Sequence, residues 1–205
     1  MIMSMYKVIC VTNRRLAGAE FLSQLEKIVQ TEVAAVVLRE KDMEEAEYEQ
    51  LAKEADRLCR AAGVPLVIHS HTAVAERLKL PNLHLPCAGL SVMTEEEKQR
   101  FKAIGASVHS VKEAREAYRA GASCLIAGHI YETECKKGKE PRGIQYLEEI
   151  CQAVPIPVYA IGGITPANAG ECKRAGAAGV CVMSSLMQSE EPEQFVEALL
   201  ECASE

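Results

Sequence analysis

The chain has 205 residues, of which 48% are apolar and 25% are charged, and its formal net charge is −6. This length suits one domain with a sizeable core, so we expect a single domain over residues 1–205. A nucleic-acid-binding surface should be basic, and the acidic balance argues against that class of partner. The sequence contains neither an apolar run long enough to span a membrane nor a recognisable signal peptide, which predicts a cytoplasmic protein without a membrane partner.

Eight short apolar segments, typical of buried strands, follow one another along the chain. They span residues 6–12, 34–40, 65–70, 82–86, 104–109, 123–130, 157–163 and 179–185. Amphipathic segments separate most of them and predict helices, for example over 43–63 and 110–121. The second of these ends at a glycine, as helices commonly do. After residues 82–86 the only helical candidate is the short segment 94–102.

Near-continuous apolar strands indicate a parallel sheet that is covered on both faces. Eight strands that alternate with helices predict the α/β class and a compact (β/α)8 TIM barrel. An open doubly wound sheet is the alternative, but its usual GxGxxG motif is absent after the first strand, where TNRRLAG stands instead. Active sites of TIM barrels lie at the C-terminal ends of the strands, so we expect the functional residues there.

Glycines and serines follow the last two predicted strands. Gly162 and Gly163 end the seventh strand, and Ser184 and Ser185 end the eighth. TIM barrels commonly bind phosphate at this place through backbone N–H groups and a helix N-terminus, and glycine lets the backbone approach the anion. We therefore predict a phosphate site formed by these four residues. The alternative is that the two glycines only make a turn.

Cationic and hydroxyl side chains occupy the same predicted rim. Arg39 and Lys41 follow the second strand, Ser107 lies at the end of the fifth, and Thr133 and Lys136 follow the sixth. Three cations on one rim favour an anionic substrate although the chain as a whole is acidic. We assign all five residues to substrate or phosphate binding.

Two histidines end neighbouring strands, His109 after the fifth and His129 after the sixth. An imidazole can accept or donate a proton near neutral pH, so we predict both as catalytic. The nine cysteines form no CxxC pair, and neither they nor the HSH segment at 69–71 predicts a metal site. The residues thus predict an acid–base enzyme for a small phosphorylated anion, with no cofactor and no metal.

Five of these segments together resemble the thiamine-phosphate-synthase superfamily, in the same order and at barrel-like spacing. They are VVLREK (36–41), SVHS (107–110), GHIYETECKKG (128–138), AIGGITP (160–166) and VMSS (182–185). The resemblance implies a TIM barrel and an Arg-x-Lys substrate segment at Arg39 and Lys41.

Departures from the synthase pattern point to one branch of the superfamily. The synthases carry an aspartate after the third strand and another after the fourth, and these hold a magnesium ion. This chain has Ser70 and Gly89 at those places. The synthases have a proline where this chain has His129, and GH followed by ETxCKKG is similar to the TenI-type thiazole tautomerases.

The resemblance implies a metal-independent isomerase of thiamine biosynthesis. It would convert a thiazole carboxylate phosphate, its small-molecule partner, into the aromatic tautomer, with His129 as the proton-transfer base. Two alternatives stay open: a thiamine phosphate synthase, which couples a thiazole phosphate to a pyrimidine diphosphate, and a non-catalytic regulatory or ligand-binding barrel. Assembly as a homodimer also stays open.

Overall fold

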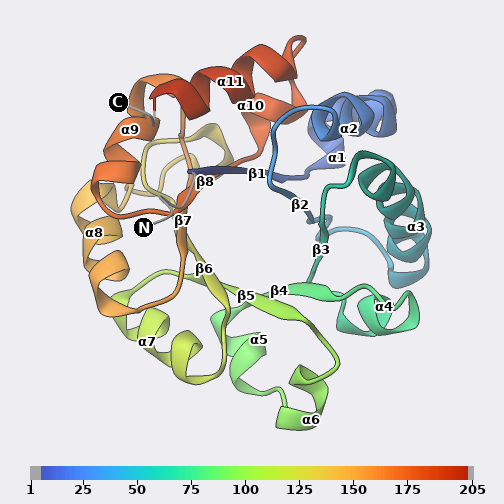
Figure 1. Ribbon diagram of the computed structural model, residues 1–205, viewed down its shortest axis with the longest axis horizontal. Helices are drawn as coiled ribbons and strands as arrows, with labels where there is room; N and C mark the ends of the chain where they lie inside the picture. The colour runs from blue at the N-terminus through green and yellow to red at the C-terminus, as the bar shows by residue number, and fades with distance from the viewer. Residues whose placement is uncertain (1–5, 203–205) are drawn as a thin grey trace.

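The computed structural model describes residues 6–202, and these fold into a closed parallel barrel surrounded by helices (Figure 1). The strands pair in the order of the chain, and β1 closes the barrel against β8. Their bounds are β1 Lys7–Val11, β2 Ala35–Leu38, β3 Leu66–His69, β4 Asn82–Pro86, β5 Ala103–Val108, β6 Cys124–Gly128, β7 Val158–Ile161 and β8 Gly179–Val182. The predicted (β/α)8 TIM barrel is confirmed.

All eight predicted strands are present, and most are shorter than their apolar segments. Residues 39–40, 129–130, 162–163 and 183–185 leave the sheet at the strand ends. Most of these residues lie on the C-terminal rim, where the chain turns away to begin the next connection. Most of the residues predicted to act on substrate therefore stand just outside the strands, while Ser107 lies within β5, close to its C-terminal end.

Helices fill the connections on the outside of the barrel. They are α1 Arg14–Ala17, the 3-10 turn η1 Gly18–Glu20, α2 Phe21–Val29, α3 Glu45–Ala62, α4 Thr72–Arg77, α5 Cys87–Ser91, α6 Glu95–Lys98, α7 Val111–Arg119, the 3-10 turn η2 Glu134–Lys136, α8 Gly143–Ala153, α9 Pro166–Arg174, α10 Ser184–Met187 and α11 Pro192–Cys202. The predicted helices over 43–63 and 110–121 are confirmed as α3 and α7. The connection after β4 differs from the prediction, because it contains two short helices, α5 and α6.

Two hydrophobic cores stabilise the fold. The larger one lies between the sheet and the helices, and it holds the outward-facing strand residues together with side chains such as Leu25, Tyr48 and Leu147. The smaller one fills the barrel with Ile9, Val11, Val37, Ile126, Tyr159 and Cys181. Most of these interior residues belong to β1 and β6–β8. The β3–β5 side of the interior instead carries the polar side chains of His69, His84 and Ser107.

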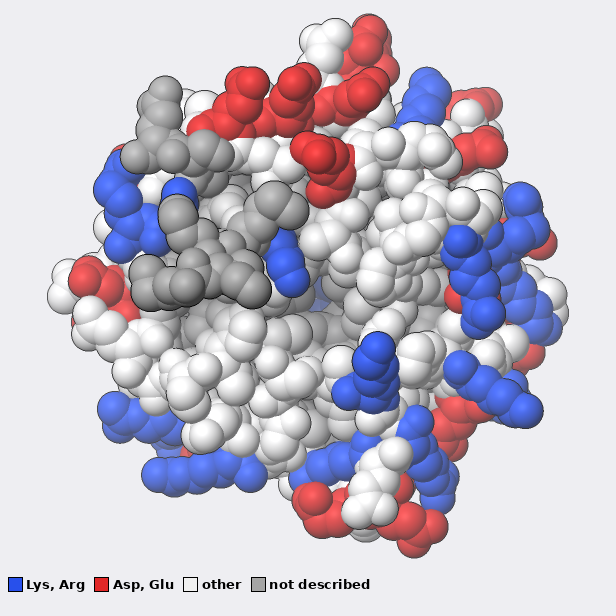
Figure 2. Space-filling model, viewed as in Figure 1, with Lys and Arg blue, Asp and Glu red and all other residues white. Residues whose placement is uncertain are grey.

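Charge is distributed unevenly over the surface. In Figure 2 acidic side chains gather along α11, which carries Glu193, Glu197 and Glu201, while Lys and Arg gather on other parts of the visible face. The net charge of the chain therefore does not determine the sign of a local site. Among residues 6–202 no helix is long and apolar enough to cross a membrane.

Candidate functional site

The segment after β2 is held in place by a buried carboxylate. Glu40, whose side chain is 1% exposed, accepts hydrogen bonds from the Thr12 hydroxyl (2.6 Å) and from the backbone N–H of Arg14 (3.0 Å). The same Thr12 hydroxyl accepts a hydrogen bond from the backbone N–H of Arg39 (3.0 Å). Because Thr12 follows β1, these bonds connect the ends of two neighbouring strands. They fix the backbone from which Arg39 and Lys41 project.

The loop after β6 brings a third cation, Lys136, close to Lys41. The pKa of Lys41 is lowered, mainly by the positive charge of Arg39 and further by burial and by Lys136. Burial lowers the pKa of Arg39, opposed by Glu40 and by Cys135 of the same loop. Charges influence one another in this way only over short distances in a protein. The three predicted cations therefore share one region of the rim.

A polar row of side chains crosses the inside of the barrel from β3 to β5. The rings of His69 and His84 lie 5.7 Å apart with 23° between their planes, and both residues are buried. His84 Nε2 lies 2.8 Å from Ser107 Oγ, and His69 Nδ1 lies 2.9 Å from Ser70 Oγ. Sequence reasoning missed His84. The alternation in Asn82-Leu-His-Leu-Pro, which puts His84 on the inward face of β4, could have identified it.

His71 makes its ring contact elsewhere, although its charge acts weakly on His69. Its ring stacks on Tyr48 of α3, with 3.8 Å between centroids, whereas His69 faces His84 inside the barrel. Ser70 between them has a positive φ of 66°, so the strand direction is not continued past His69. The two histidines of HSH are thus held by different parts of the fold.

The two predicted catalytic histidines are connected through one peptide group. His109 Nδ1 lies 3.0 Å from the carbonyl oxygen of Gly128, the residue before His129. His129 Nε2 lies 3.2 Å from the carbonyl oxygen of Lys139. A carbonyl oxygen only accepts hydrogen bonds, so the ring nitrogen carries the proton in each case. In their neutral forms, His109 is left with a lone pair on Nε2 and His129 with one on Nδ1.

Gly162 and Gly163 lie directly beside the segment that carries His129. Both have positive φ, 104° and 65°, a conformation that favours glycine. A Cβ on Gly162 would approach His129 Cα to 2.9 Å, and a Cβ on Gly163 would approach Tyr131 Cβ to 2.8 Å. Hydrogen bonds from Ile130 to Ile161 and from Tyr131 to Gly162, each 3.0 Å long, hold the two loops together. The predicted phosphate loop and the predicted base therefore pack against each other.

Ser184 and Ser185 begin α10 directly after β8, next to the end of β7 in the sheet. The first N–H groups of a helix have no acceptor within the helix, so they are free to face a ligand. Both serines are partly exposed. Thr133 precedes η2, and its carbonyl accepts the backbone N–H of Lys136 (2.9 Å), so it shapes the turn that carries this cation.

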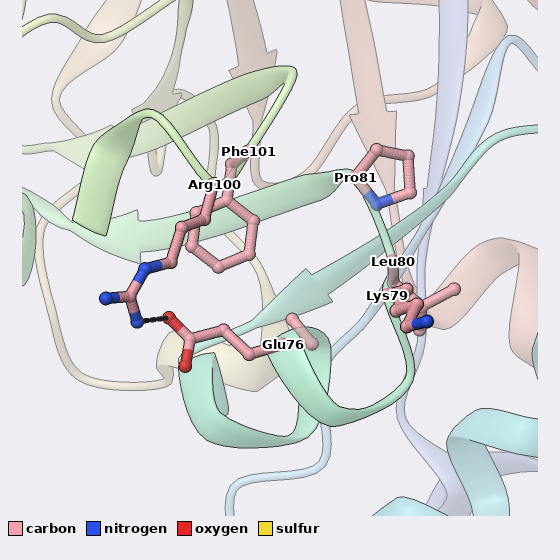
Figure 3. A pocket seen from close by; sticks show the side chains of 7 residues that line it. Glu76, Lys79, Leu80, Pro81, Arg100 and Phe101 are labelled. Carbon is pink, nitrogen blue, oxygen red and sulfur yellow. Dashed lines mark hydrogen bonds and ion pairs between the residues drawn. The ribbon is translucent and has the colours of Figure 1, made fainter. Parts of the chain in front are cut away.

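A surface pocket of about 350 Å³ lies away from all these residues (Figure 3). It is lined by Glu76, Lys79, Leu80, Pro81, Arg100 and Phe101, with Ala75. These residues surround the N-terminal starts of β4 and β5, the end of the barrel opposite the rim. Arg100 there is already paired with Glu76 at 3.1 Å.

Comparison with known proteins identifies the family. The family model described as thiamine monophosphate synthase matches residues 8–186. The chain belongs to the thiamine monophosphate synthase family. It is 36% identical over 192 residues to thiamine-phosphate synthase 2 of Streptococcus pneumoniae TIGR4, covering 93% of this chain and 91% of the relative. It is 34% identical to thiamine-phosphate synthase of Roseiflexus castenholzii, covering 97% and 88%.

The fold of the family is confirmed by a solved relative. Thiamine phosphate pyrophosphorylase from Pyrococcus furiosus superposes with a TM-score of 0.85 and 28% identity, covering 98% of this chain and 96% of that one. The predicted superfamily and its role in thiamine biosynthesis are therefore correct. The names of these relatives agree with the synthase alternative rather than with the tautomerase branch or the isomerase class.

The magnesium ion expected for synthases of the family does not fit the residues of this rim. Ser70 offers one hydroxyl, which is engaged with His69, and Gly89 offers no side chain. Glu40 is the carboxylate beside Arg39, and it already accepts from Thr12 and Arg14. Over residues 6–202 no three His, Cys, Asp or Glu side chains are grouped to hold a metal. Magnesium prefers carboxylate oxygens, and this rim does not present free ones at the expected places.

Proposed function

We propose that this member of the thiamine monophosphate synthase family is a thiazole tautomerase that aromatises a thiazole carboxylate phosphate. Its site would transfer a proton without forming a bond between two substrates. His129 is assigned as the general base. The four residues Gly162, Gly163, Ser184 and Ser185 are assigned to the phosphate.

The observation that carries this proposal is the hydrogen bonding of His129 next to the glycine pair. Because Nε2 donates to the carbonyl of Lys139, the basic nitrogen of the neutral ring is Nδ1. Gly162 packs so closely on His129 that only a hydrogen atom fits between them. A substrate whose phosphate is bound at these glycines would be anchored within reach of the ring, which converts proton transfer into an intramolecular event.

The proposed reaction rearranges one molecule and leaves its atomic composition unchanged. Nδ1 of His129 takes the proton from ring carbon 2, which bears the carboxylate. The exocyclic carbon takes up one proton and the protonated His129 gives up the one it holds, so no net proton is gained or lost. The electron pair of the broken C–H bond enters the ring, and aromaticity drives the step. A positioned general base typically contributes about 10²–10⁴-fold. His109 would orient the loop through the Gly128 carbonyl.

The cations of the rim support an anionic substrate. Arg39 and Lys136 both act electrostatically on Lys41, and such a cluster favours carboxylate and phosphate groups. Ser107 and Thr133 are assigned to the same substrate as hydroxyl partners.

The second candidate is thiamine-phosphate synthase activity, which the names of the relatives favour. It would need the chain to bind a pyrimidine diphosphate and to neutralise the leaving diphosphate. The poor fit of magnesium to Ser70 and Gly89 speaks against it. Incubation of the protein with thiazole phosphate, pyrimidine diphosphate and magnesium tests it, since coupled product would establish this second candidate.

The direct test of the tautomerase is the rate of aromatisation of the exocyclic thiazole carboxylate phosphate. We expect the purified protein to accelerate it above the uncatalysed rate, and His129→Ala to lose most of the acceleration. Equal rates with and without the protein would refute the proposal.

A further inference from the structure

His84 lies inside the barrel, below the rim, and the proposed proton transfer does not use it. The residue is 2% exposed, and its ring sits between His69 of β3 and Ser107 of β5. Gly105 leaves the space for it, because a Cβ at Gly105 would approach His84 Nδ1 to 2.5 Å. A buried polar ring needs hydrogen bonds to offset its burial, and here the partner is a residue of the proposed binding site.

The hydrogen bond between His84 and Ser107 determines what the serine can do for a ligand. Its length is 2.8 Å, from His84 Nε2 to Ser107 Oγ. If Nε2 has the lone pair, the hydroxyl donates its only hydrogen to the ring and can only accept a hydrogen bond from a ligand. If Nε2 has the proton, the hydroxyl accepts from the ring and keeps its hydrogen for a ligand.

Only one of these two arrangements exists at a time, because the ring is neutral. Burial, with His69 adding to it, lowers the pKa of His84 to about 3. At neutral pH the ring therefore carries a single proton, on either Nε2 or Nδ1. A doubly protonated ring, which would also donate to Ser107, is absent under these conditions.

The rim favours the arrangement in which Ser107 donates. Ser107 is partly exposed and pairs in register with the inward-facing Ile126, so its hydroxyl faces the barrel interior. The charges of Arg39 and Lys41 reach His69, the neighbour of His84. A cationic site of this kind selects anions, and phosphate or ionised carboxylate oxygens only accept hydrogen bonds.

We infer that His84 is a positioning residue whose Nε2–H holds Ser107 as a hydrogen-bond donor to an anionic group of the substrate. This inference rests on the proposed function, because it takes Ser107 to contact a carboxylate or phosphate. The buried polar row would then contribute to substrate binding through Ser107.

The protonated nitrogen can be observed directly. Long-range proton–nitrogen NMR spectra of protein with 15N-labelled histidine distinguish a protonated ring nitrogen from one with a lone pair, and the signals lost in His84→Gln assign the ring. We expect a proton on Nε2 of His84 in the wild-type protein without ligand. A lone pair on Nε2 would overturn the inference.

A double-mutant cycle tests whether His84 acts through Ser107. The affinity for the aromatic thiazole carboxylate phosphate is measured for His84→Leu, Ser107→Ala and the double variant. We expect Ser107→Ala, which removes the donor, to raise Kd about tenfold, and His84→Leu, which leaves the hydroxyl without the partner that orients it, to raise Kd by up to about tenfold. The double variant should match Ser107→Ala, because His84 acts only through the hydroxyl that is already missing. His84→Gln, whose amide can also donate, should restore most of the affinity. If His84→Leu does not fold, His84→Gln is measured in its place.

The control is His71→Gln, a histidine outside the barrel that should leave Kd unchanged. Effects of the two changes that multiply, so that the double variant binds clearly more weakly than Ser107→Ala, would overturn the inference. A further outcome is that the wild-type protein binds the product, with non-additive affinity losses in the His84 and Ser107 variants, and yet fails to accelerate aromatisation. That result would refute the proposed function and retain the role of His84. A product that does not bind the wild-type protein would refute both.

Discussion

The ring of His109 donates a hydrogen bond through Nδ1 to the carbonyl oxygen of Gly128, over 3.0 Å, and so holds the peptide that precedes His129. One histidine therefore supports the backbone of the other. This relationship separates the two rings by role, although both end neighbouring strands. His129 is assigned the proton transfer, and His109 the orientation of the residue that performs it.

We predict that His129→Ala or His129→Gly lowers the aromatisation rate by at least about tenfold, and by up to about 10²–10⁴-fold, while the protein stays folded. His109→Ala should have a smaller effect, because the remaining hydrogen bonds of the loop still position His129. Rates are measured against the uncatalysed reaction, with His71→Ala as a matched histidine outside the barrel. A folded His129→Ala protein with the wild-type rate would contradict the mechanism.

We expect phosphate or sulfate to bind at the backbone of Gly162, Gly163, Ser184 and Ser185. Gly163→Ala should weaken the binding of inorganic phosphate, because the added Cβ would press on Tyr131 and displace the loop. Gly121→Ala is the control, since Gly121 also has a positive φ (93°) but its Cβ would meet open space. Calorimetric titration with phosphate measures both variants. Equal affinity in the two, or a phosphate-grown crystal with water alone at this site, would contradict the assignment.

We predict that activity is unchanged by EDTA. The reason is the donor set at the ends of β3 and β4, where Ser70 and Gly89 stand. The assay compares aromatisation rates before and after chelation and after addition of magnesium. Activity that is lost on chelation and restored by magnesium would place this chain with the synthases.

The Thr12–Glu40 bond should contribute to stability. Thr12→Val removes the hydroxyl that donates to Glu40 and accepts from Arg39, and it leaves a buried carboxylate with fewer donors. We expect the free energy of unfolding to fall by about 1–3 kcal/mol. Thr31→Val is the control. Within residues 6–202 the Thr31 hydroxyl donates to the carbonyl of Ile28, three residues earlier in the chain, and connects no two strands. Urea unfolding compares the two, and equal losses would count against a special role of Thr12.

The buried histidines should make stability depend on pH. Burial, with Arg39 and Lys41, lowers the pKa of His69 to about 4, and burial, with His69, lowers that of His84 to about 3. In the unfolded chain both titrate near about 6.5. Below that pH the unfolded state binds more protons than the folded state, so the free energy of unfolding decreases as pH falls from about 6.5 toward 4. Above this window both forms are neutral and the contribution is constant.

Each buried histidine should give a slope of up to about 1.4 kcal/mol per pH unit in this window. His84→Gln should therefore be less steep than the wild-type protein between about pH 5 and 6.5, above the range in which most carboxylates titrate. Urea unfolding at a series of pH values measures the two slopes. Identical slopes would show that His84 is not held as a neutral ring.

The sequence by itself was sufficient for the barrel, because its signals are local. Eight apolar segments alternate with amphipathic ones, and a parallel sheet with covered faces is the arrangement that buries all of them. The same pattern put His129, Gly162 and Ser184 at strand ends. The short connection after β4 was predicted less well, because α5 and α6 are brief and depend on packing against neighbouring elements.

Only the tertiary structure decided which of these residues meet. Lys136 acts electrostatically on Lys41 because the loop after β6 extends toward the end of β2. His84 bonds to Ser107, and His109 to the carbonyl of Gly128, because neighbouring strands of the closed sheet fix their register. Sequence patterns determine which face of a strand a side chain occupies, whereas hydrogen-bond partners and the protonated nitrogen of each ring depend on distances set by barrel closure.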